Sequence, residues 1–171
     1  MSEPPQPAIP HVLEVDVVED DGDWSSLPDA SDLIAKAAAA VAQELGGNAG
    51  SGMVAVALSS DASVEALNGQ FRGKPKPTNV LSFPAGEGSP EGFVGDVILA
   101  AETLRREADE QDVPLSHHLQ HLIVHGILHL FGYDHISADD GERMEAIEIS
   151  VLSRLGVANP YTGALETGTS D

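Results

Sequence analysis

The chain of 171 residues contains no cysteine. Disulfide bonds and thiolate metal ligands are therefore excluded, and any transition-metal site must use histidine and carboxylate side chains. No apolar run reaches the roughly 18 residues that a membrane-spanning helix requires. The N-terminal stretch MSEPPQPAIP lacks the basic start and the apolar core of a signal peptide, so we expect a cytoplasmic protein that does not enter a membrane.

Basic residues are also scarce. Eight Lys and Arg stand against 28 Asp and Glu, which gives a formal net charge of −20 at pH 7. Such a balance opposes general nucleic-acid binding, because affinity for a polyanion comes largely from Lys and Arg. The window ALNGQFRGKPKPTNV, residues 66–80, is an exception, since it has Arg72, Lys74 and Lys76 and no acid. It is either a solvated loop or a basic surface that holds phosphates.

The apolar pattern predicts an α/β fold of the α+β type. Alternating or continuous apolar runs predict strands at residues 11–18, 53–60, 80–83 and 94–100. Helical periodicity predicts helices at 31–45, from 61 to about 69, and at 100–111, 114–131 and 138–155. We therefore expect a single mixed β-sheet of about four strands packed against about five helices. One domain would span 11–158, between a disordered lead-in over 1–10 and a C-terminal tail over 159–171.

Several residues mark the expected helix ends. Asp29 or Ser31 can cap the first helix, Asp61 the second and Ser137 the last, because short polar side chains accept hydrogen bonds from the first free backbone N–H groups. Gly46 and the glycine after it end the first helix, since glycine adopts the left-handed conformation that closes helices.

The stretch HGILHLFGYDH, residues 125–135, has the spacing of a metal site. His125 and His129 lie one helical turn apart and project from the same face. Gly132, just past the helix end, can take a positive φ and bring His135 back toward the other two. Three imidazoles leave a coordination position open for water, which is typical of a catalytic zinc centre. The sequence thus predicts one zinc ion, or another divalent transition metal, at the end of a core helix.

Zinc proteases with this histidine spacing carry a glutamate after the first histidine, where this chain has Gly126. Asp134 is either a partner that orients a metal-bound imidazole or a turn residue. Met144, at the place of a protease methionine, is better explained as a core residue. We therefore expect a hydrolase in which the metal itself acidifies water, with His125 among its ligands. Arg72 is the candidate cation for the charge that develops on a phosphodiester.

The motif HLIVHGILHLFGYDH, together with LNGQFRGKPKPTNVLSFP and VGDVILA upstream, resembles the bacterial YbeY family of metal-dependent endoribonucleases. The resemblance covers about residues 11–161, and even GVANPY is similar to the family's C-terminal end. It implies an α/β fold with one sheet and a zinc-like ion on three histidines. Those residues are His125, His129 and His135.

The resemblance also implies roles outside the metal ligands. Arg72 matches the family's arginine and is expected to take part in cleaving single-stranded RNA, while Lys74 and Lys76 hold the strand. His121 matches another histidine of the motif, and either lines the cleft or is an exposed helical residue. Ser82 and Phe83 either wall the cleft or pack at the end of their strand. The family's role in maturing the 3′ end of 16S rRNA and in ribosome quality control implies the small ribosomal subunit and its proteins as partners.

Two other classes remain open. A noncatalytic ribosome-assembly factor would use the metal only to fix the helix end, so Arg72→Ala would leave its function intact. A metalloprotease would need a base to replace the missing glutamate. The Pro-rich lead-in and the acidic stretch at 19–23 depart from the family pattern.

Overall fold

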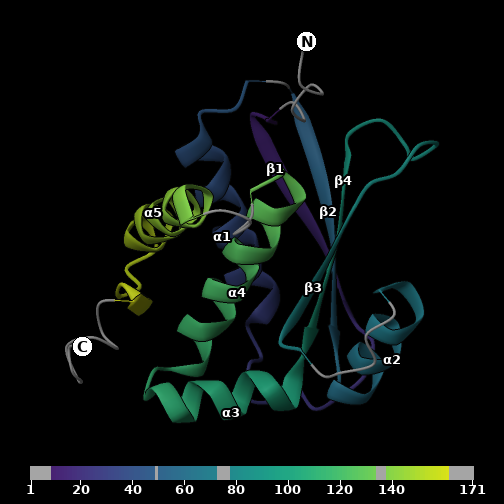
Figure 1. Cartoon of the computed structure of the whole chain (residues 1–171), viewed down its shortest axis with the longest axis vertical. Coiled ribbons are helices and arrows are strands. Elements are labelled where there is room, and N and C mark those ends of the chain that lie inside the picture. Colours follow the sequence, from purple (N-terminus) through teal and green to yellow (C-terminus); the bar gives the residue numbers. More distant parts are fainter. Residues whose placement is uncertain (1–8, 49, 73–77, 134–137, 162–171) are drawn as a thin grey trace.

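The computed structural model describes residues 9–48, 50–72, 78–133 and 138–161, and is built around one four-stranded sheet (Figure 1). The strand order is β1-β2-β4-β3. Strands β1 and β4 both run parallel to β2, and β3 pairs antiparallel with β4 at the edge. The strands are β1 (Val12–Glu19), β2 (Ser51–Ser59), β3 (Val80–Pro84) and β4 (Phe93–Ala100).

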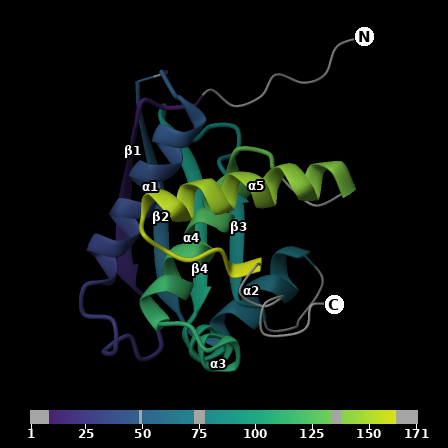
Figure 2. The same cartoon turned by 90° about the vertical axis from the view of Figure 1, so that its left-hand side faces the viewer.

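Helices cover both faces of this sheet. The helices are α1 (Ala30–Leu45), α2 (Asp61–Arg72), α3 (Ala101–Gln111), α4 (Leu115–Leu130) and α5 (Ala138–Arg154). Helices α1 and α4 pack on one face and α2 on the other, while α5 crosses α1 and α4 on their outer side (Figures 1 and 2). The predicted mixed sheet of about four strands with about five helices is therefore confirmed. Within the described ranges, no helix is long and apolar enough to span a membrane.

Helix α4 lies at the centre of the molecule because it is covered on several sides. Ten of its sixteen residues are buried, and among them Leu119, Ile123, Ile127 and Leu128 are fully enclosed. Burial of four large aliphatic side chains contributes roughly 6–12 kcal/mol to folding before entropy is counted. The helix that carries His125 and His129 is thus held in place by a largely buried surface.

The end of α1 follows the sequence prediction, but its start does not. Gly46 adopts the left-handed conformation, with φ of 67°, and closes the helix. Asp29 occupies the N-cap position without accepting a side-chain hydrogen bond from the first turn. The expected cap by the Asp29 side chain is therefore wrong. The expected cap by Ser137 lies outside the described residues.

The start of α2 corrects a second capping prediction. The hydroxyl of Ser60 accepts the backbone N–H of Ser63 at 3.1 Å, so Ser60 and not Asp61 caps this helix. The Asp61 carboxylate instead accepts the backbone N–H and the hydroxyl of Thr103, both at 2.9 Å. It thereby ties the start of α2 to the start of α3. Helix α2 also continues through Gly69, beyond the end expected from the sequence.

Candidate metal centre

Three histidines lie one turn apart along one side of α4, and two of them reach Glu148 of α5. The three are His121, His125 and His129. The Nε2 atoms of His125 and His129 are 3.1 Å apart, and the two rings meet edge to face with centroids 4.5 Å apart. The side chain of His125 is 23% exposed, so a small ligand can reach it from solvent.

The separation of these two Nε2 atoms suits a shared metal ion. Two nitrogens each about 2.0–2.1 Å from a tetrahedral zinc ion are about 3.3 Å apart. The observed 3.1 Å is close to this value, so both imidazoles fit zinc with little movement. Gly132 adopts a φ of 98°, as the sequence predicted, and turns the chain after α4. Among the described residues no set of three or more ligands assembles, and His135 lies outside them.

A buried carboxylate of α5, that of Glu148, contacts two of these histidines. Glu148 is 0% exposed, and its Oε2 atom accepts a hydrogen bond from Nδ1 of His125 at 2.6 Å. Its Oε1 atom lies 3.2 Å from Nε2 of His121 and accepts the hydroxyl of Tyr161. Burial acts to raise the pKa of Glu148, but hydrogen bonds from His121, His125 and Tyr161 outweigh it and lower the pKa to about 2. The carboxylate is therefore ionised at neutral pH.

Glu148 is a site residue that the sequence reasoning missed. The sequence did carry a sign of its role, because Glu148 is a charged residue on the apolar face of α5 that also contains the buried Met144, Val151 and Leu152. Met144 is fully buried, which agrees with its interpretation as a core residue. Asp134, for which the sequence left open a role as partner of an imidazole or as a turn residue, lies outside the described residues.

Tyr161 is the second residue that was missed, because it was assigned to the C-terminal tail. Its ring meets His121 edge to face, with centroids 5.9 Å apart. Burial, together with the neighbouring Glu148 carboxylate, raises the pKa of the Tyr161 phenol. The phenol therefore stays protonated and acts as a hydrogen-bond donor. His121 is 15% exposed in its side chain and so belongs to this cluster rather than to the open surface.

The remaining predicted residues fall into two groups. Ser82 donates its hydroxyl to the carbonyl of Gly126 at 3.0 Å, and Phe83 packs on the α2 side of the sheet against a small apolar cluster. Arg72 is the last residue of α2, but its side chain and the whole of Lys74 and Lys76 lie outside the described residues. The basic window therefore stays a prediction.

A second histidine–carboxylate pair lies beside the first. His118 is 3% exposed, and its Nε2 atom is 2.8 Å from Oε1 of Glu107, which also accepts the side-chain amide of Asn79 at 3.0 Å. Burial lowers the pKa of His118 despite the hydrogen bond to Glu107. Its ring also meets that of His121 at a centroid distance of 5.9 Å. The pair links α3 to the candidate metal centre.

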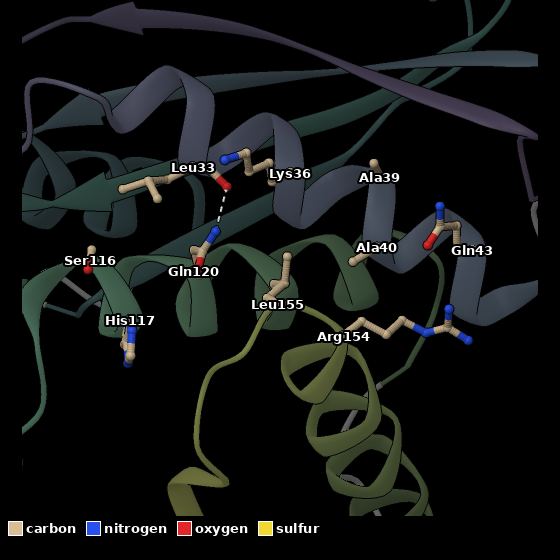
Figure 3. Close-up of a pocket in the computed structure, with 10 residues that line it drawn as sticks. All are labelled: Leu33, Lys36, Ala39, Ala40, Gln43, Ser116, His117, Gln120, Arg154 and Leu155. Carbon is tan, nitrogen blue, oxygen red and sulfur yellow. Dashed lines mark hydrogen bonds between the residues drawn. The ribbon is translucent and has the colours of Figure 1, made fainter.

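A groove of about 490 Å³ lies elsewhere, between α1, the start of α4 and the end of α5 (Figure 3). Figure 3 shows Gln120 of α4 reaching the carbonyl of Leu33, a hydrogen bond of 3.0 Å across the groove. Its two cations already have acidic neighbours, since Lys36 is 3.2 Å from Asp32 and Arg154 is 2.8 Å from a glutamate of α1. The groove is not lined by His121, His125 or His129, and both of these cations are paired with an acid.

Comparison with known proteins decides which family this arrangement belongs to. The family model described as Endoribonuclease YbeY matches residues 19–156. The chain belongs to the YbeY endoribonuclease family. It is 46% identical over 164 residues to the Endoribonuclease YbeY of Bradyrhizobium sp. strain BTAi1, a match that covers 92% of this chain and 95% of the relative. The YbeY of Maricaulis maris is 48% identical over 147 residues, 86% of this chain and 91% of that one.

A solved structure supports the same assignment of the fold. The solution structure of TM1509 from Thermotoga maritima matches this chain with a TM-score of 0.53 and 29% sequence identity. The match covers 85% of this chain and 92% of TM1509. The two proteins thus share one fold over most of each chain.

Gly126, at the position where zinc proteases carry their glutamate, faces the sheet. A Cβ atom on Gly126 would lie 3.0 Å from Val97 and 3.2 Å from the hydroxyl of Ser82. A large side chain would crowd the contact between α4 and strands β3 and β4, because Val97 is fully buried. The first side-chain atom of a glutamate there would be directed at the sheet.

The first prediction concerns this contact. Gly126→Glu should lower the free energy of unfolding by more than about 3 kcal/mol, because it overpacks the helix–sheet contact and buries a charge. Urea unfolding followed by circular dichroism measures the change. Ser116→Glu, in the half-exposed first turn of α4, is the control and should unfold near the wild-type midpoint. A stable Gly126→Glu protein would contradict the close contact.

The second prediction concerns His118 and pH. Because burial lowers the pKa of His118 in the folded protein, protons bind the unfolded chain preferentially below about pH 6.5. The stability that neutral His118 contributes is therefore present above pH 6.5 and declines as the pH falls through that value. The wild type should lose stability relative to His118→Gln between pH 7.5 and 5.5, by at most about 1.4 kcal/mol per pH unit. Paired urea titrations measure the difference, and a constant or growing wild-type advantage would show that the pKa is not lowered.

Proposed function

We propose that this protein is a metal-dependent endoribonuclease that cuts single-stranded RNA. The observation that carries the metal dependence is the convergence of Nε2 of His125 and Nε2 of His129 at 3.1 Å. Membership of the YbeY endoribonuclease family supplies the class of reaction. Gly126 argues against a metalloprotease, because it stands where such enzymes carry the glutamate that acts as a base, and its position is closely packed against the sheet.

His125 and His129, together with His135, would hold one zinc ion, with another divalent transition metal as an alternative occupant. Zinc in that place would supply a Lewis acid that lowers the pKa of a water molecule to about 7. The chain's own part is to present two imidazole nitrogens from one rigid, buried helix. Neither nitrogen has to move far, so little binding energy is lost in ordering the ligands.

The substrate would be held by the basic window after α2. Arg72 would bind the scissile phosphate, because a guanidinium group matches two phosphate oxygens at once. Lys74 and Lys76 would hold the neighbouring phosphates as point charges. With a net charge of −20, the rest of the chain repels RNA, so these three cations would set where a strand can lie.

The biological substrate that we propose is the 3′ end of 16S rRNA, with a further part in ribosome quality control. The small ribosomal subunit and its proteins would then be the partners, and the cytoplasm the place of action. This proposal rests on the resemblance of the histidine and T-N-V-L-S-F-P motifs to those of the YbeY family.

The third prediction tests metal and arginine in one assay. Zinc-loaded protein should cut a labelled single-stranded RNA that spans a 16S 3′ end, and should leave the same sequence intact in a duplex. His129→Ala and Arg72→Ala should each lower the cleavage rate by at least about 100-fold, as expected when a metal ligand or a phosphate-binding cation is lost.

Matched controls separate the site from general effects of charge. His117→Ala removes another α4 histidine, and Arg106→Ala removes an exposed arginine of α3. Both controls should cleave at the wild-type rate. Cleavage that survives His129→Ala and Arg72→Ala would contradict the proposed site. A wild type that binds zinc and the small subunit but cuts no RNA would favour the noncatalytic assembly factor.

A further inference from the structure

The residues after α5 return the chain to the histidine cluster. Gly156 adopts a φ of 76°, and the backbone N–H of Val157 donates to the carbonyl of Leu152 at 2.9 Å, so the chain reverses at the helix end. Val157 is 8% exposed and packs into the core. The side chain of Asn159 accepts the backbone N–H of Tyr161 at 2.8 Å. These contacts direct the Tyr161 hydroxyl to Glu148.

The hydrogen bond between Glu148 and His125 determines which nitrogen of His125 carries a proton. An ionised carboxylate only accepts hydrogen bonds, so Nδ1 of His125, at 2.6 Å from Oε2, must be the protonated nitrogen. In a neutral ring the lone pair then lies on Nε2, which is the atom that faces His129. The carboxylate therefore selects the form of His125 that can bind a metal.

Tyr161 determines how firmly that carboxylate is held. Oε1 of Glu148 accepts a hydrogen bond from the Tyr161 hydroxyl and lies 3.2 Å from Nε2 of His121. Oε2 accepts a hydrogen bond from Nδ1 of His125. Donors on both oxygens leave the carboxylate little freedom to rotate about its terminal torsion. Without the phenol, Oε1 would keep, of these two contacts, the longer one to His121.

Stability alone gives no reason for a carboxylate at this position. Glu148 is fully buried among the apolar residues of α5, and burying a charge there is unfavourable compared with an apolar side chain of the same size. The hydrogen bonds offset that penalty without turning it into a large gain. A positioning role explains the residue better, because an apolar side chain could not select the His125 tautomer.

We propose that Glu148 and Tyr161 act together as positioning residues that hold His125 in its Nδ1-protonated tautomer. The inference rests on the proposed metal site, since its functional consequence is tighter binding of the ion by Nε2 of His125 and Nε2 of His129. The segment that ends at Tyr161 is then a part of the metal centre and not only a tail.

The fourth prediction uses two readouts on Glu148→Gln and Tyr161→Phe. Nitrogen-15 NMR of the metal-free proteins should show His125 protonated at Nδ1 in the wild type. Glu148→Gln should show a mixture of tautomers, because an amide can either accept from Nδ1 or donate to it. Tyr161→Phe removes one hydroxyl and should shift the same equilibrium to a smaller extent.

The second readout is zinc affinity, measured by competition with a chromophoric chelator. Glu148→Gln should lower the affinity by about 10–100-fold and Tyr161→Phe by about 10-fold, the range found for partners that orient metal ligands. Glu44→Gln is the matched control, because it removes a carboxylate that accepts hydrogen bonds from Ser150 and Arg154 of the same helix. The control should bind zinc within twofold of the wild type and keep the wild-type tautomer.

Each outcome decides a part of the proposal. An unchanged His125 tautomer in both variants, or zinc affinities within twofold of the wild type, would overturn it. An effect of Glu148→Gln without any effect of Tyr161→Phe would overturn the role of the C-terminal segment. A wild type that retains no zinc would contradict the proposed metal dependence, and the NMR readout would still decide whether Glu148 and Tyr161 select the tautomer. If Glu148→Gln fails to fold, Tyr161→Phe decides, since it removes one oxygen from a half-buried ring.

Discussion

The close contact between α4 and the sheet at Gly126 constrains the helix that carries His121, His125 and His129. A Cβ atom at Gly126 would lie 3.0 Å from Val97 and 3.2 Å from the Ser82 hydroxyl, so any side chain there requires these neighbours to shift. Because successive residues of a helix point about 100° apart, His125 and His129 project to the same side of the direction in which Gly126 meets the sheet, about 100° and 60° from it. On that side His125 reaches Glu148 of α5. This contact limits how far α4 can rotate about its axis, and the spacing of four residues brings the two imidazoles together on one side.

The face that meets α5 combines apolar packing with a polar network. On α5, Met144, Val151 and Leu152 are buried apolar residues. Glu148 lies between them, and its carboxylate accepts hydrogen bonds from His121, His125 and Tyr161. Within the part of the chain that the structure describes, no buried side-chain nitrogen or oxygen lacks a hydrogen-bond partner. A network of this kind is rigid when every member is satisfied, and loses that rigidity when one member is removed. Helix packing and metal-site geometry therefore depend on the same residues.

The sequence was sufficient for the elements and for the histidine pair because their signals are local. Spacing of four residues on a helix placed His125 and His129 on one face, and Gly132 adopted the expected positive φ. Apolar alternation located the strands, and Gly46 ended α1. Capping predictions failed where a tertiary partner competed, as when Asp61 turned to Thr103 of α3 instead of its own helix.

The carboxylate partner could not be located in the same way, since it depends on how α5 crosses α4. Nothing local connects Glu148 to His125, 23 residues earlier, or to Tyr161 in the segment beyond the helix. A charged residue within an apolar helix face was the available sign. Asp134 was considered because it precedes His135 in the sequence, and it lies outside the described residues. The carboxylate beside His125 is that of Glu148.

The central claim is that the Nε2 atoms of His125 and His129 bind the same ion. Anomalous diffraction at the zinc absorption edge, from crystals grown with one equivalent of zinc, tests it most directly. The account predicts one strong peak between these two Nε2 atoms, at about 2.0–2.1 Å from each. A peak at other residues, or none between the two histidines at full zinc loading, would contradict it.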